Sequence, residues 1–434
     1  MRKYLIICAL ILAGFAASSK KNALVLTNPL AIERPDETIV LKRADLEAKV
    51  GLVPDGYAPI LMLKCQNVPS QVDDMNHDGK WDELAFTVSF KASETLSLDV
   101  TLMAIASYPT FEKRTNVRLG ILQPDKSYME VDHFTAPLCR DGFKIIAQGE
   151  SVSWENDKMG FRNYFDCRNV KDLFGKLKPG LIIDKIQTPE ITDYHVLSTW
   201  GMDILHCGSS LGSGGLAMLQ SDSLYRLGST DNYEYQKICE GPVRSVFDLK
   251  YKGWHVANEN LSAVERISIY PGKYWFQSDV TVSGFSGEKQ IVTGIVTTFL
   301  KNKPSDFVAN EAYRSIATLD KQSENKDELG MAVLLKKDEV TKVARTTNID
   351  FYNLGYKTVD EKKFSNVISE TYYVAQKIKP EVKARHYFFA VWGLENAKWK
   401  SMDNFRAYIS SEADFLSHPI QMAFKGDVDM PTGK

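Results

Sequence analysis

The chain has 434 residues, of which 44% are apolar and 25% are charged, and its formal net charge at pH 7 is -2. This balance supports a sizeable folded core, excludes a largely disordered chain, and gives no positive field that would attract nucleic acid. None of the six cysteines forms a CxxC pair. That sparsity argues against a cysteine-ligated zinc site and a disulfide framework, while one bridge stays compatible with the count.

Residues 1–18 have the composition of a secretory signal peptide. Two basic residues precede the apolar run LIICALILAGFAA, which is too short to span a bilayer and is followed by small residues. Cys8 lies within this run, without the small residues that would precede a lipid-attachment site. No later segment is long and apolar enough to cross a membrane. We therefore expect an exported protein, periplasmic or extracellular, that is not embedded in the membrane.

The segment 19–110 alternates short β-rich runs with polar turns, a spacing typical of a small β-sandwich. The runs are ALVLTN, ETIVLKR, APILMLKC, LAFTVSF and SLDVTLMAIA. A plausible joint follows at residues 107–116. We expect these residues to form an N-terminal domain.

The segment 111–434 continues with β-rich runs and little helical periodicity, which favours large antiparallel sheets over βαβ units. Its predicted strands include IDKIQTPE (residues 183–190), PVRSVFDLKY, KYWFQSDVTVSG, QIVTGIVTTFL and RHYFFAVWGLE. Helices are expected to be few. One is predicted within residues 401–419, where Ser401 can cap the first turn, Phe405, Ile409 and Leu416 share a face, and Pro419 follows the end.

A candidate calcium loop lies in VPSQVDDMNHDGKWDELAF, residues 68–86. Its spacing follows the start of an EF-hand loop, with Gly79 at the sharp turn and oxygen ligands from Asp74, Asn76, Asp78, the Lys80 carbonyl and Asp82. Ala85 stands where the closing carboxylate belongs, so Glu83 or a distant residue would have to replace it. The alternative is a solvated β-hairpin turn, for which Asp-Gly is itself a signal. We expect any Ca²⁺ here to be structural, and no organic cofactor.

The run FRNYFDCR, residues 161–168, alternates polar and apolar side chains. In one continuous strand, a period of two places four polar side chains on one face: Arg162, Tyr164, Asp166 and Arg168. Such a row can bind a sugar acid, because Arg matches a carboxylate with two hydrogen bonds while Tyr and Asp exchange protons. An ion-pair ladder on an outer strand face is the alternative. Upstream, Trp154 and Glu155 add an aromatic platform and a carboxylate, although Trp in a β protein commonly belongs to the core.

Residues 193–218 form a stretch rich in Gly and Ser that is typical of a long loop entering a strand at GGLAM. The candidate binding and catalytic side chains in it are Tyr194, His195, Trp200, Asp203 and His206. Either histidine alone is also compatible with a surface or core role. The GSSLGSGG segment lacks the Lys-Ser/Thr ending of a phosphate loop, and its serines lack the GxSxG spacing of a nucleophile elbow. We expect this loop and the 154–168 segment to form one site on the concave face of the larger domain.

Six segments in chain order carry a resemblance to a known family: NPLAIERPDETIVL, VPSQVDDMNHDGKWDELAF, FRNYFDCRNVKDLFGK, WGMDILHCGSSLGSGGLAM, GPVRSVFDLKYKGW and HYFFAVWGL. Together they resemble exported bacterial proteins of about this length that are classified as a domain of unknown function. Genes of that family tend to accompany polysaccharide-utilisation systems, including pectin-type ones. The resemblance implies a small β-sandwich followed by a β-supersandwich of the kind seen in galactose mutarotases and several polysaccharide lyases. It supplies no established catalytic residues.

The leading hypothesis is an enzyme that acts on uronic-acid-containing oligosaccharides. In β-elimination, Arg162 or Arg168 would neutralise the uronate while His195, His206 or Tyr164 moved protons. Hydrolysis would use a carboxylate pair from Asp166, Asp203 and Glu155, and a mutarotase-like reaction would need one His with a Glu or Asp. The residues expected to contact substrate are Trp154, Glu155, Arg168, Tyr194 and Trp200. A non-catalytic glycan-binding protein is the alternative, a structural surface protein is a third, and the oligomeric state stays open.

Overall fold

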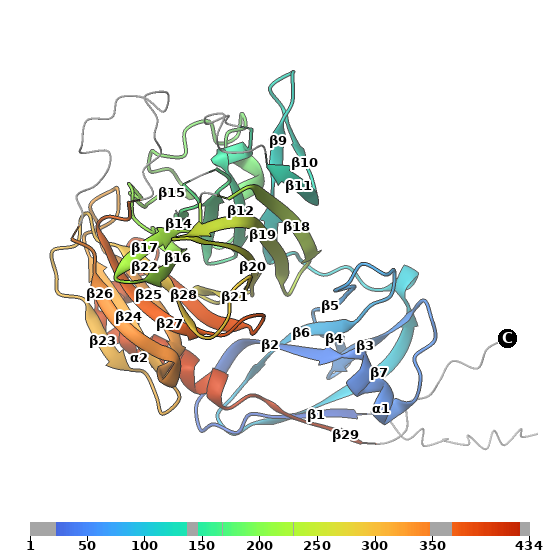
Figure 1. Ribbon diagram of the computed structural model, residues 1–434. Helices are drawn as coiled ribbons and strands as arrows, with labels where there is room; N and C mark the ends of the chain where they lie inside the picture. Colours follow the sequence, from blue (N-terminus) through green and yellow to red (C-terminus); the bar gives the residue numbers. More distant parts are fainter. Residues whose placement is uncertain (1–22, 137–145, 167, 229, 348–366, 426–434) are drawn as a thin grey trace, which may run out of the picture.

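The computed structural model describes residues 23–136, 146–166, 168–228, 230–347 and 367–425. Figure 1 shows a smaller β body, mostly blue, beside a larger one that contains most of the other described residues. Strands dominate the described residues, the sheets are built from antiparallel pairs, and two α-helices are present among these residues. The predicted mainly β, antiparallel fold with few helices is therefore confirmed. The predicted signal peptide lies outside the described residues.

The smaller body is a sandwich of two sheets. The first sheet has the order β29 (Gln421–Lys425), β1 (Ala23–Thr27), β7 (Thr95–Ala104), β3 (Tyr57–Leu63) and β4 (Gln66–Asn67). The second has the order β2 (Arg34–Lys42), β6 (Glu83–Phe90) and β5 (Ser70–Asp73), and helix α1 (Arg43–Val50) follows β2. Alternate residues of β1, Leu24 and Leu26, are buried in the core between the sheets. The alternation of buried and more exposed residues in β1 is the pattern expected for a strand that packs one face on a core.

The chain returns to the smaller body at its C-terminal end. Strand β29 pairs with β1 along its whole length, and Ile420 just before it joins the same core. In Figure 1 the red strand lies directly beside the blue one. The sequence analysis did not foresee this pairing, because a single edge strand carries no signal that names its partner.

The larger body contains a nine-stranded sheet. Its order is β11 (His133–Ala136), β18 (Asn232–Glu240), β19 (Ser245–Val256), β20 (Glu259–Ile269), β21 (Trp275–Ser283), β28 (Ala384–Trp392), β25 (Leu329–Lys336), β24 (Tyr313–Asp320) and β23 (Ser305–Val308). Two five-stranded sheets accompany it. One runs β15 (Gly201–Asp203), β14 (Lys171–Lys176), β13 (Met159–Tyr164), β12 (Ser151–Asn156) and β8 (Thr115–Arg118). The other runs β17 (Ser223–Arg226), β16 (Ser213–Gln220), β22 (Lys289–Val296), β27 (Thr371–Ile378) and β26 (Val340–Arg345).

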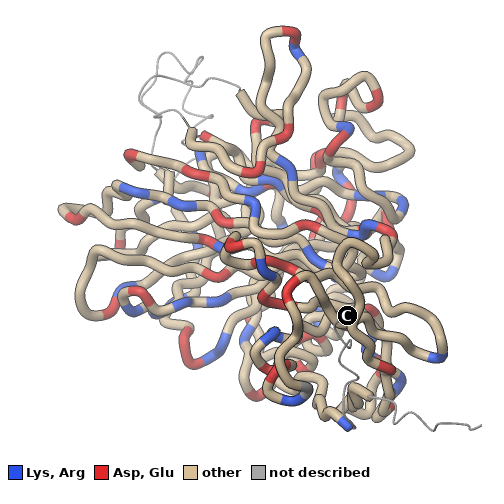
Figure 2. The backbone as a smooth tube through the Cα atoms, turned by 90° about the vertical axis from the view of Figure 1, so that its right-hand side faces the viewer, with Lys and Arg blue, Asp and Glu red and all other residues tan. Residues whose placement is uncertain are grey.

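Smaller elements complete the larger body. Strands β9 (Gly120–Leu122) and β10 (Tyr128–Glu130) form a hairpin that projects from it in Figure 1. Among the described residues, η1 (Ile105–Ser107) directly follows β7 of the smaller body, and the other 3-10 helices are η3 (Gln148–Glu150), η4 (Ile183–Lys185), η5 (Lys337–Glu339) and η8 (Ala397–Lys400). Basic and acidic residues are interspersed along the chain in the view of Figure 2. Neither α-helix of the described ranges has the length and apolar character that crossing a bilayer requires.

An aromatic cluster joins the sheets of the larger body face to face. Trp154 of β12 is fully buried, and its ring centroid lies 5.8 Å from that of Phe161, 5.3 Å from Phe247 and 5.2 Å from Phe276. Phe247 and Phe276 belong to the nine-stranded sheet. Such edge and offset contacts add to the burial of large apolar surfaces. These aromatic contacts therefore hold β12 against the nine-stranded sheet.

Helix α2 (Met402–Ser417) is confirmed where the sequence predicts it. Ser401 caps it by accepting a hydrogen bond from the Asn404 backbone N–H, and Phe405 and Ile409 face the core. The strand predicted at 183–190 is wrong. Ile183 and Ile186 are both buried, three residues apart, in a small cluster with Phe174, Ile191 and Tyr194, so this segment folds into η4 and turns instead.

Arg244 joins the larger body to the smaller sandwich. This buried side chain, between β18 and β19, donates to Asp73 Oδ2 at 2.7 Å and to Glu83 Oε2 at 2.8 Å. Beside it, Gln71 Oε1 accepts the backbone N–H groups of Val243 and Arg244 at 2.9 and 3.0 Å. The two bodies are thus connected by charge-assisted hydrogen bonds as well as by the polypeptide.

Replacing Arg244 with Ala is expected to lower the free energy of unfolding by about 3–5 kcal/mol, because Asp73 would remain buried without its counter-charge. Denaturant unfolding followed by tryptophan fluorescence measures the change. Arg314→Ala is the matched control, since its ion pair with Asp306 is about one-third exposed and should contribute less than about 1 kcal/mol. Equal losses in the two variants would contradict this role.

His386 of β28 makes the stability of the fold depend on pH. It is buried, its Nε2 atom has no hydrogen-bond partner among the described residues, and burial, assisted by Lys171, lowers its pKa to about 3. An unfolded chain binds this proton below a pH of about 6.5. Between these values the unfolded state holds more protons than the folded state, so stability falls as the pH falls, by up to about 1.4 kcal/mol per pH unit.

The variant His386→Asn should therefore show a shallower loss of stability than the parent between pH 6.5 and 3, measured as the slope of unfolding free energy against pH. His255→Asn removes a histidine whose side chain is 56% exposed and should leave the slope unchanged. Parallel slopes for the parent and His386→Asn would show that His386 does not cause the pH dependence.

Candidate active site

A cavity of about 750 Å³ opens at the edge of the sheet formed by β12 to β15. Segments that are far apart in the sequence contribute to it: the turn between β13 and β14, the loop before β15, the segment after β15, and the loop between β24 and β25. Its lining residues are Tyr164, Arg168, Val170, His195, Val196, Leu197, Met202, Asp203, Leu205, His206, Cys207, Gly208, Glu324 and Asn325. The two predicted clusters thus meet in one place.

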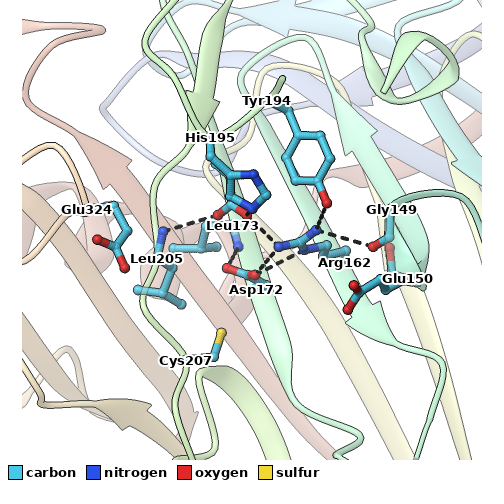
Figure 3. A network of polar contacts seen from close by, with 12 residues as sticks. Gly149, Glu150, Arg162, Asp172, Leu173, Tyr194, His195, Leu205, Cys207 and Glu324 are labelled. Carbon is cyan, nitrogen blue, oxygen red and sulfur yellow. Dashed lines mark hydrogen bonds and ion pairs between the residues drawn. The ribbon is translucent and has the colours of Figure 1, made fainter. Parts of the chain in front are cut away.

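The Arg162 guanidinium lies behind the cavity wall and connects these segments. Its Nη2 atom is 2.6 Å from Asp172 Oδ2 and 2.5 Å from Asp203 Oδ2, and it also donates to the Tyr164 hydroxyl at 2.8 Å. Its Nη1 atom donates to the Tyr194 hydroxyl at 3.3 Å. In Figure 3 dashed lines join the guanidinium to Asp172, to the Tyr194 hydroxyl and to the Gly149 carbonyl. Arg162 is 1% exposed, so the prediction that it contacts a substrate carboxylate is wrong.

One buried guanidinium faces two buried carboxylates, and this arrangement affects the pKa of Asp203. Burial raises the pKa of Asp203 well above its ordinary value; Arg162 opposes the rise and the nearby Asp172 adds to it. Although burial opposes it, Asp203, Tyr164 and Asp172 raise the pKa of Arg162, so the guanidinium stays charged. A single positive charge can balance one of the two carboxylates, and Asp203 therefore tends to keep its proton.

His195 extends this network into the cavity. Its Nε2 atom lies 3.6 Å from Asp203 Oδ2, and its ring packs on that of Tyr194 with centroids 4.2 Å apart. The His195 side chain is 65% exposed while Asp203 is 4% exposed. An exposed imidazole next to a buried carboxyl can pass protons between the network and a bound molecule.

The backbone fixes the loop that carries His195. Asp203 donates its N–H to the Tyr194 carbonyl at 2.8 Å, and Ser198 and Gly201 exchange backbone hydrogen bonds. Gly201 has φ 139°, and a Cβ atom there would lie 1.8 Å from the Gly175 carbonyl oxygen. Only glycine fits this position.

A second histidine and carboxylate pair lines the same cavity. His206 Nδ1 lies 3.0 Å from Glu324 Oε1, and both side chains are partly exposed. The Glu324 backbone N–H donates to the Ile204 carbonyl at 2.9 Å, which fixes the Glu324 loop against the segment that carries His206. The cavity therefore contains two imidazoles, each beside its own carboxyl group.

The polar row predicted along 161–168 is only partly correct. Strand β13 ends at Tyr164, and Asp166 and Arg168 lie in the turn that follows, closed by the Asn169 N–H to the Asp166 carbonyl. Arg168 bonds to Asp166 and Glu150, each at 2.6 Å. Because a turn replaces the second half of the strand, Asp166 does not line the cavity, whereas Tyr164 and Arg168 do.

Three predicted contact residues lie elsewhere. Trp154 belongs to the aromatic core, and Glu155 is fully buried, pairing with Lys176 and accepting the N–H groups of Ile182 and Ile183. Trp200 packs near Phe174, with ring centroids 6.5 Å apart. None of the three is among the described residues that line the cavity. Trp154 and Glu155 are neighbours in β12 and therefore point to opposite faces of the sheet, and both of these faces are buried. Tyr194 is also buried, under the His195 ring, and supports the site from behind.

Sequence reasoning missed three residues of the site. Asp172 is the direct cross-strand partner of Arg162 in the β13–β14 pair, so an antiparallel hairpin with its turn at 165–170 would have identified it. No sequence pattern indicated Glu324, because it lies in the loop between β24 and β25, more than a hundred residues after His206. Cys207 lines the cavity, but burial raises the pKa of its thiol well above its ordinary value, which disfavours a thiolate nucleophile.

The Asp74 loop is stabilised by its own backbone. Asp74 accepts the N–H groups of Asp78 and Gly79, Asp78 accepts that of Lys80, and Asp82 accepts that of Met75. Gly79 has φ 88° at the sharp turn. Within the described residues, no three His, Cys, Asp or Glu side chains are grouped closely enough to hold a metal ion. The turn thus needs no ion to satisfy its N–H groups, and calcium binding at Asp74, Asn76, Asp78, Lys80, Asp82 and Glu83 stays a prediction.

Thermal unfolding tests that prediction. If the loop binds calcium, 1 mM CaCl₂, about a hundredfold over a 10 µM Kd, should stabilise the fold by about 2.7 kcal/mol and raise the unfolding midpoint, and Asp74→Asn should abolish the rise. Asp125→Asn, at an exposed turn whose side chain bonds to Ser127, is the control. An unfolding midpoint that is the same in CaCl₂ and in EDTA would contradict a calcium site at this loop.

The chain belongs to the family described as "Domain of unknown function (DUF4861)", which matches residues 26–422. This agrees with the resemblance carried by the six sequence segments. A relative from Formosa agariphila, an "Uncharacterized protein P7", is 25% identical over 299 residues, which cover 65% of this chain and 69% of that protein.

Solved structures of carbohydrate enzymes show distant similarity. An α-mannosidase from Enterococcus faecalis V583 aligns with a TM-score of 0.46 and 8% identity over 95% of this chain and 47% of that chain. The chain thus spans about half the length of the mannosidase. A putative aldose 1-epimerase from Klebsiella pneumoniae aligns with a TM-score of 0.31 and 10% identity over 74% of this chain and 100% of that chain. Both TM-scores are too low to carry an argument about this protein.

Proposed function

We propose that this protein is a carbohydrate-active enzyme that transfers protons to and from an oligosaccharide held in the cavity described above. The observation that carries the proposal is the pair of imidazole–carboxyl couples, His195 with Asp203 and His206 with Glu324, on one cavity. A cavity of about 750 Å³ has room for one or two sugar rings. Export, supported by the composition of residues 1–18, would bring the enzyme to an extracellular or periplasmic glycan.

The two couples differ, and the difference suggests their roles. Asp203 is buried and tends to keep its proton, so it can supply a proton through His195 to a departing or ring oxygen. Glu324 is partly exposed and pairs with the partly exposed His206, an arrangement suited to accepting a proton from a hydroxyl or a C–H group. Acid and base on one cavity are the requirement shared by elimination, hydrolysis and mutarotation.

Uronic-acid-containing, pectin-like oligosaccharides are the substrates that we propose on the family resemblance. With Arg162 enclosed, Arg168 is the cation among the described lining residues that can approach a uronate carboxylate. Arg168 would bind the uronate carboxylate while it stays ion-paired with Asp166 and Glu150. Among the carboxylates proposed for hydrolysis, Asp203 remains at the cavity while Glu155 and Asp166 do not line it.

A panel of pectic, alginate and glycosaminoglycan oligosaccharides tests the proposal. Absorbance reports unsaturated uronates, a reducing-end assay reports hydrolysis, and proton NMR of the anomeric signals reports mutarotation or epimerisation. Turnover of one class of oligosaccharide is expected. Binding of a glycan without any of these changes would reject the enzyme and support a glycan-binding protein.

Replacing Asp203 with Asn keeps the shape of the side chain and removes its exchangeable proton. On the substrate found in the panel, kcat is expected to fall by about 10²–10⁴ while binding is retained, and His195→Ala should give a loss of similar size. His255→Ala, an exposed histidine paired with Asp231 on another part of the protein, is the control for removing an imidazole. Full activity in Asp203→Asn would show that this carboxyl group takes no part in the proton transfer.

A further inference from the structure

We propose that the aliphatic part of the cavity wall is a subsite for a methyl group carried by the sugar. The wall consists of Val170, Val196, Leu197, Met202 and Leu205. The methyl group would be C6 of a 6-deoxyhexose or the methyl of an ester or acetyl substituent. This inference rests on the proposed function and deepens it by naming a feature of the substrate.

The aliphatic residues of the wall range from buried to exposed. Val170, Met202 and Leu205 are 1%, 4% and 5% exposed, whereas Val196 is 59% and Leu197 is 41% exposed. Single exposed aliphatic residues are common on protein surfaces. Here two adjacent ones line the same cavity as three buried ones, beside the two imidazole–carboxyl couples. A bound apolar group would remove this exposed surface from water.

The exposure of Val196 and Leu197 is imposed by the backbone. The hydrogen bond from Asp203 to Tyr194 and the exchange between Ser198 and Gly201 close the loop on both sides of these residues. The close approach of Gly201 to Gly175 fixes its position against β14. The loop therefore cannot shift to bury the two side chains without breaking these contacts.

Within the part of the chain that the structure describes, the cavity offers little of the flat aromatic surface on which sugar rings commonly stack. Apart from the imidazoles, Tyr164 contributes the one aromatic ring among the described lining residues. The Arg168 guanidinium carbon lies 3.9 Å from the centroid of that ring, and the Arg162 guanidinium carbon lies 4.7 Å from it. Because the Tyr164 ring already packs against two guanidinium groups, the aliphatic wall is the surface that we expect to contact apolar groups of the sugar.

Chemistry distinguishes a methyl group from a hydroxymethyl group at this wall. The five side chains present carbon and the Met202 sulfur, so a hydroxyl group placed against them would lose its water without gaining a side-chain partner. Burial of one methyl group corresponds to about 0.8 kcal/mol, which is a preference of about fourfold.

Saturation-transfer NMR with matched sugars tests the subsite without requiring turnover. L-Rhamnose is compared with L-mannose and L-fucose with L-galactose, pairs that differ in whether C6 carries a hydroxyl. Methyl D-galacturonate is compared with D-galacturonate to separate an ester methyl from a deoxysugar methyl. In at least one pair, the methyl-bearing member should bind about fourfold more tightly, with the strongest saturation at its methyl protons. Equal binding within every pair, or no saturation of any methyl-bearing sugar, would overturn the proposal.

Variants assign the effect to the wall. Leu197→Ser and Val196→Ser should reduce the preference toward unity, and both positions are exposed, so the fold should tolerate them. Val308→Ser, at a valine of β23 that is 64% exposed, is the matched control and should keep the parent preference. An unchanged preference in both wall variants would also overturn the proposal. Failure of the proposed catalysis would appear separately, as absent turnover with the methyl preference intact.

Discussion

The Arg162 guanidinium, buried between Asp172 and Asp203, is the interaction on which the candidate site depends. It links β13 to its neighbour β14 and to the end of β15, and its Nη2 and Nη1 atoms also donate to the hydroxyls of Tyr164 and Tyr194, respectively. A planar guanidinium can hold several acceptors in fixed directions, which an ammonium cannot do. Together with the backbone hydrogen bonds of the β15 loop, this side chain holds Asp203 next to His195.

Buried charge pairs recur throughout the fold. Lys176 pairs with Glu155, Lys171 with Glu265, and Lys273 with Glu412, all of them in the interior. Pairs of this kind contribute little net stability compared with apolar packing, but an incorrect sheet register would leave a charge buried without a partner. In a chain built from many similar antiparallel strands, we interpret them as devices that favour one arrangement over its alternatives.

The cavity lies at the edge of a sheet, so its residues fall into a buried group that supports the site and an exposed group that can contact a ligand. The sheets supply rigid support behind the site through Arg162 and Asp172, whereas the exposed groups, His195, His206 and Glu324, come from the segments between strands, as does the buried Tyr194. Loops can present side chains to a ligand because they lie at the surface, and their precision here comes from backbone hydrogen bonds to the sheets. Val196 and Leu197 lie in the same loop as His195. The proposed methyl subsite and the proposed proton-transfer group are therefore positioned by the same backbone.

The sequence by itself determined the local features. Alternating apolar residues predicted most strands, the Ser401 cap with Phe405 and Ile409 predicted α2, and the Gly-rich composition around His195 and His206 predicted that these histidines lie outside strands. These succeed because they depend on neighbours within a few residues. Only the tertiary structure decided which polar side chains reach solvent: Arg162 and Glu155 are enclosed, Trp154 is core, and Glu324 arrives from a distant loop. Burial and long-range pairing depend on how the sheets stack. A period-two pattern of polar residues looks the same on a face that meets solvent and on a buried polar layer, so it does not determine which residues are exposed.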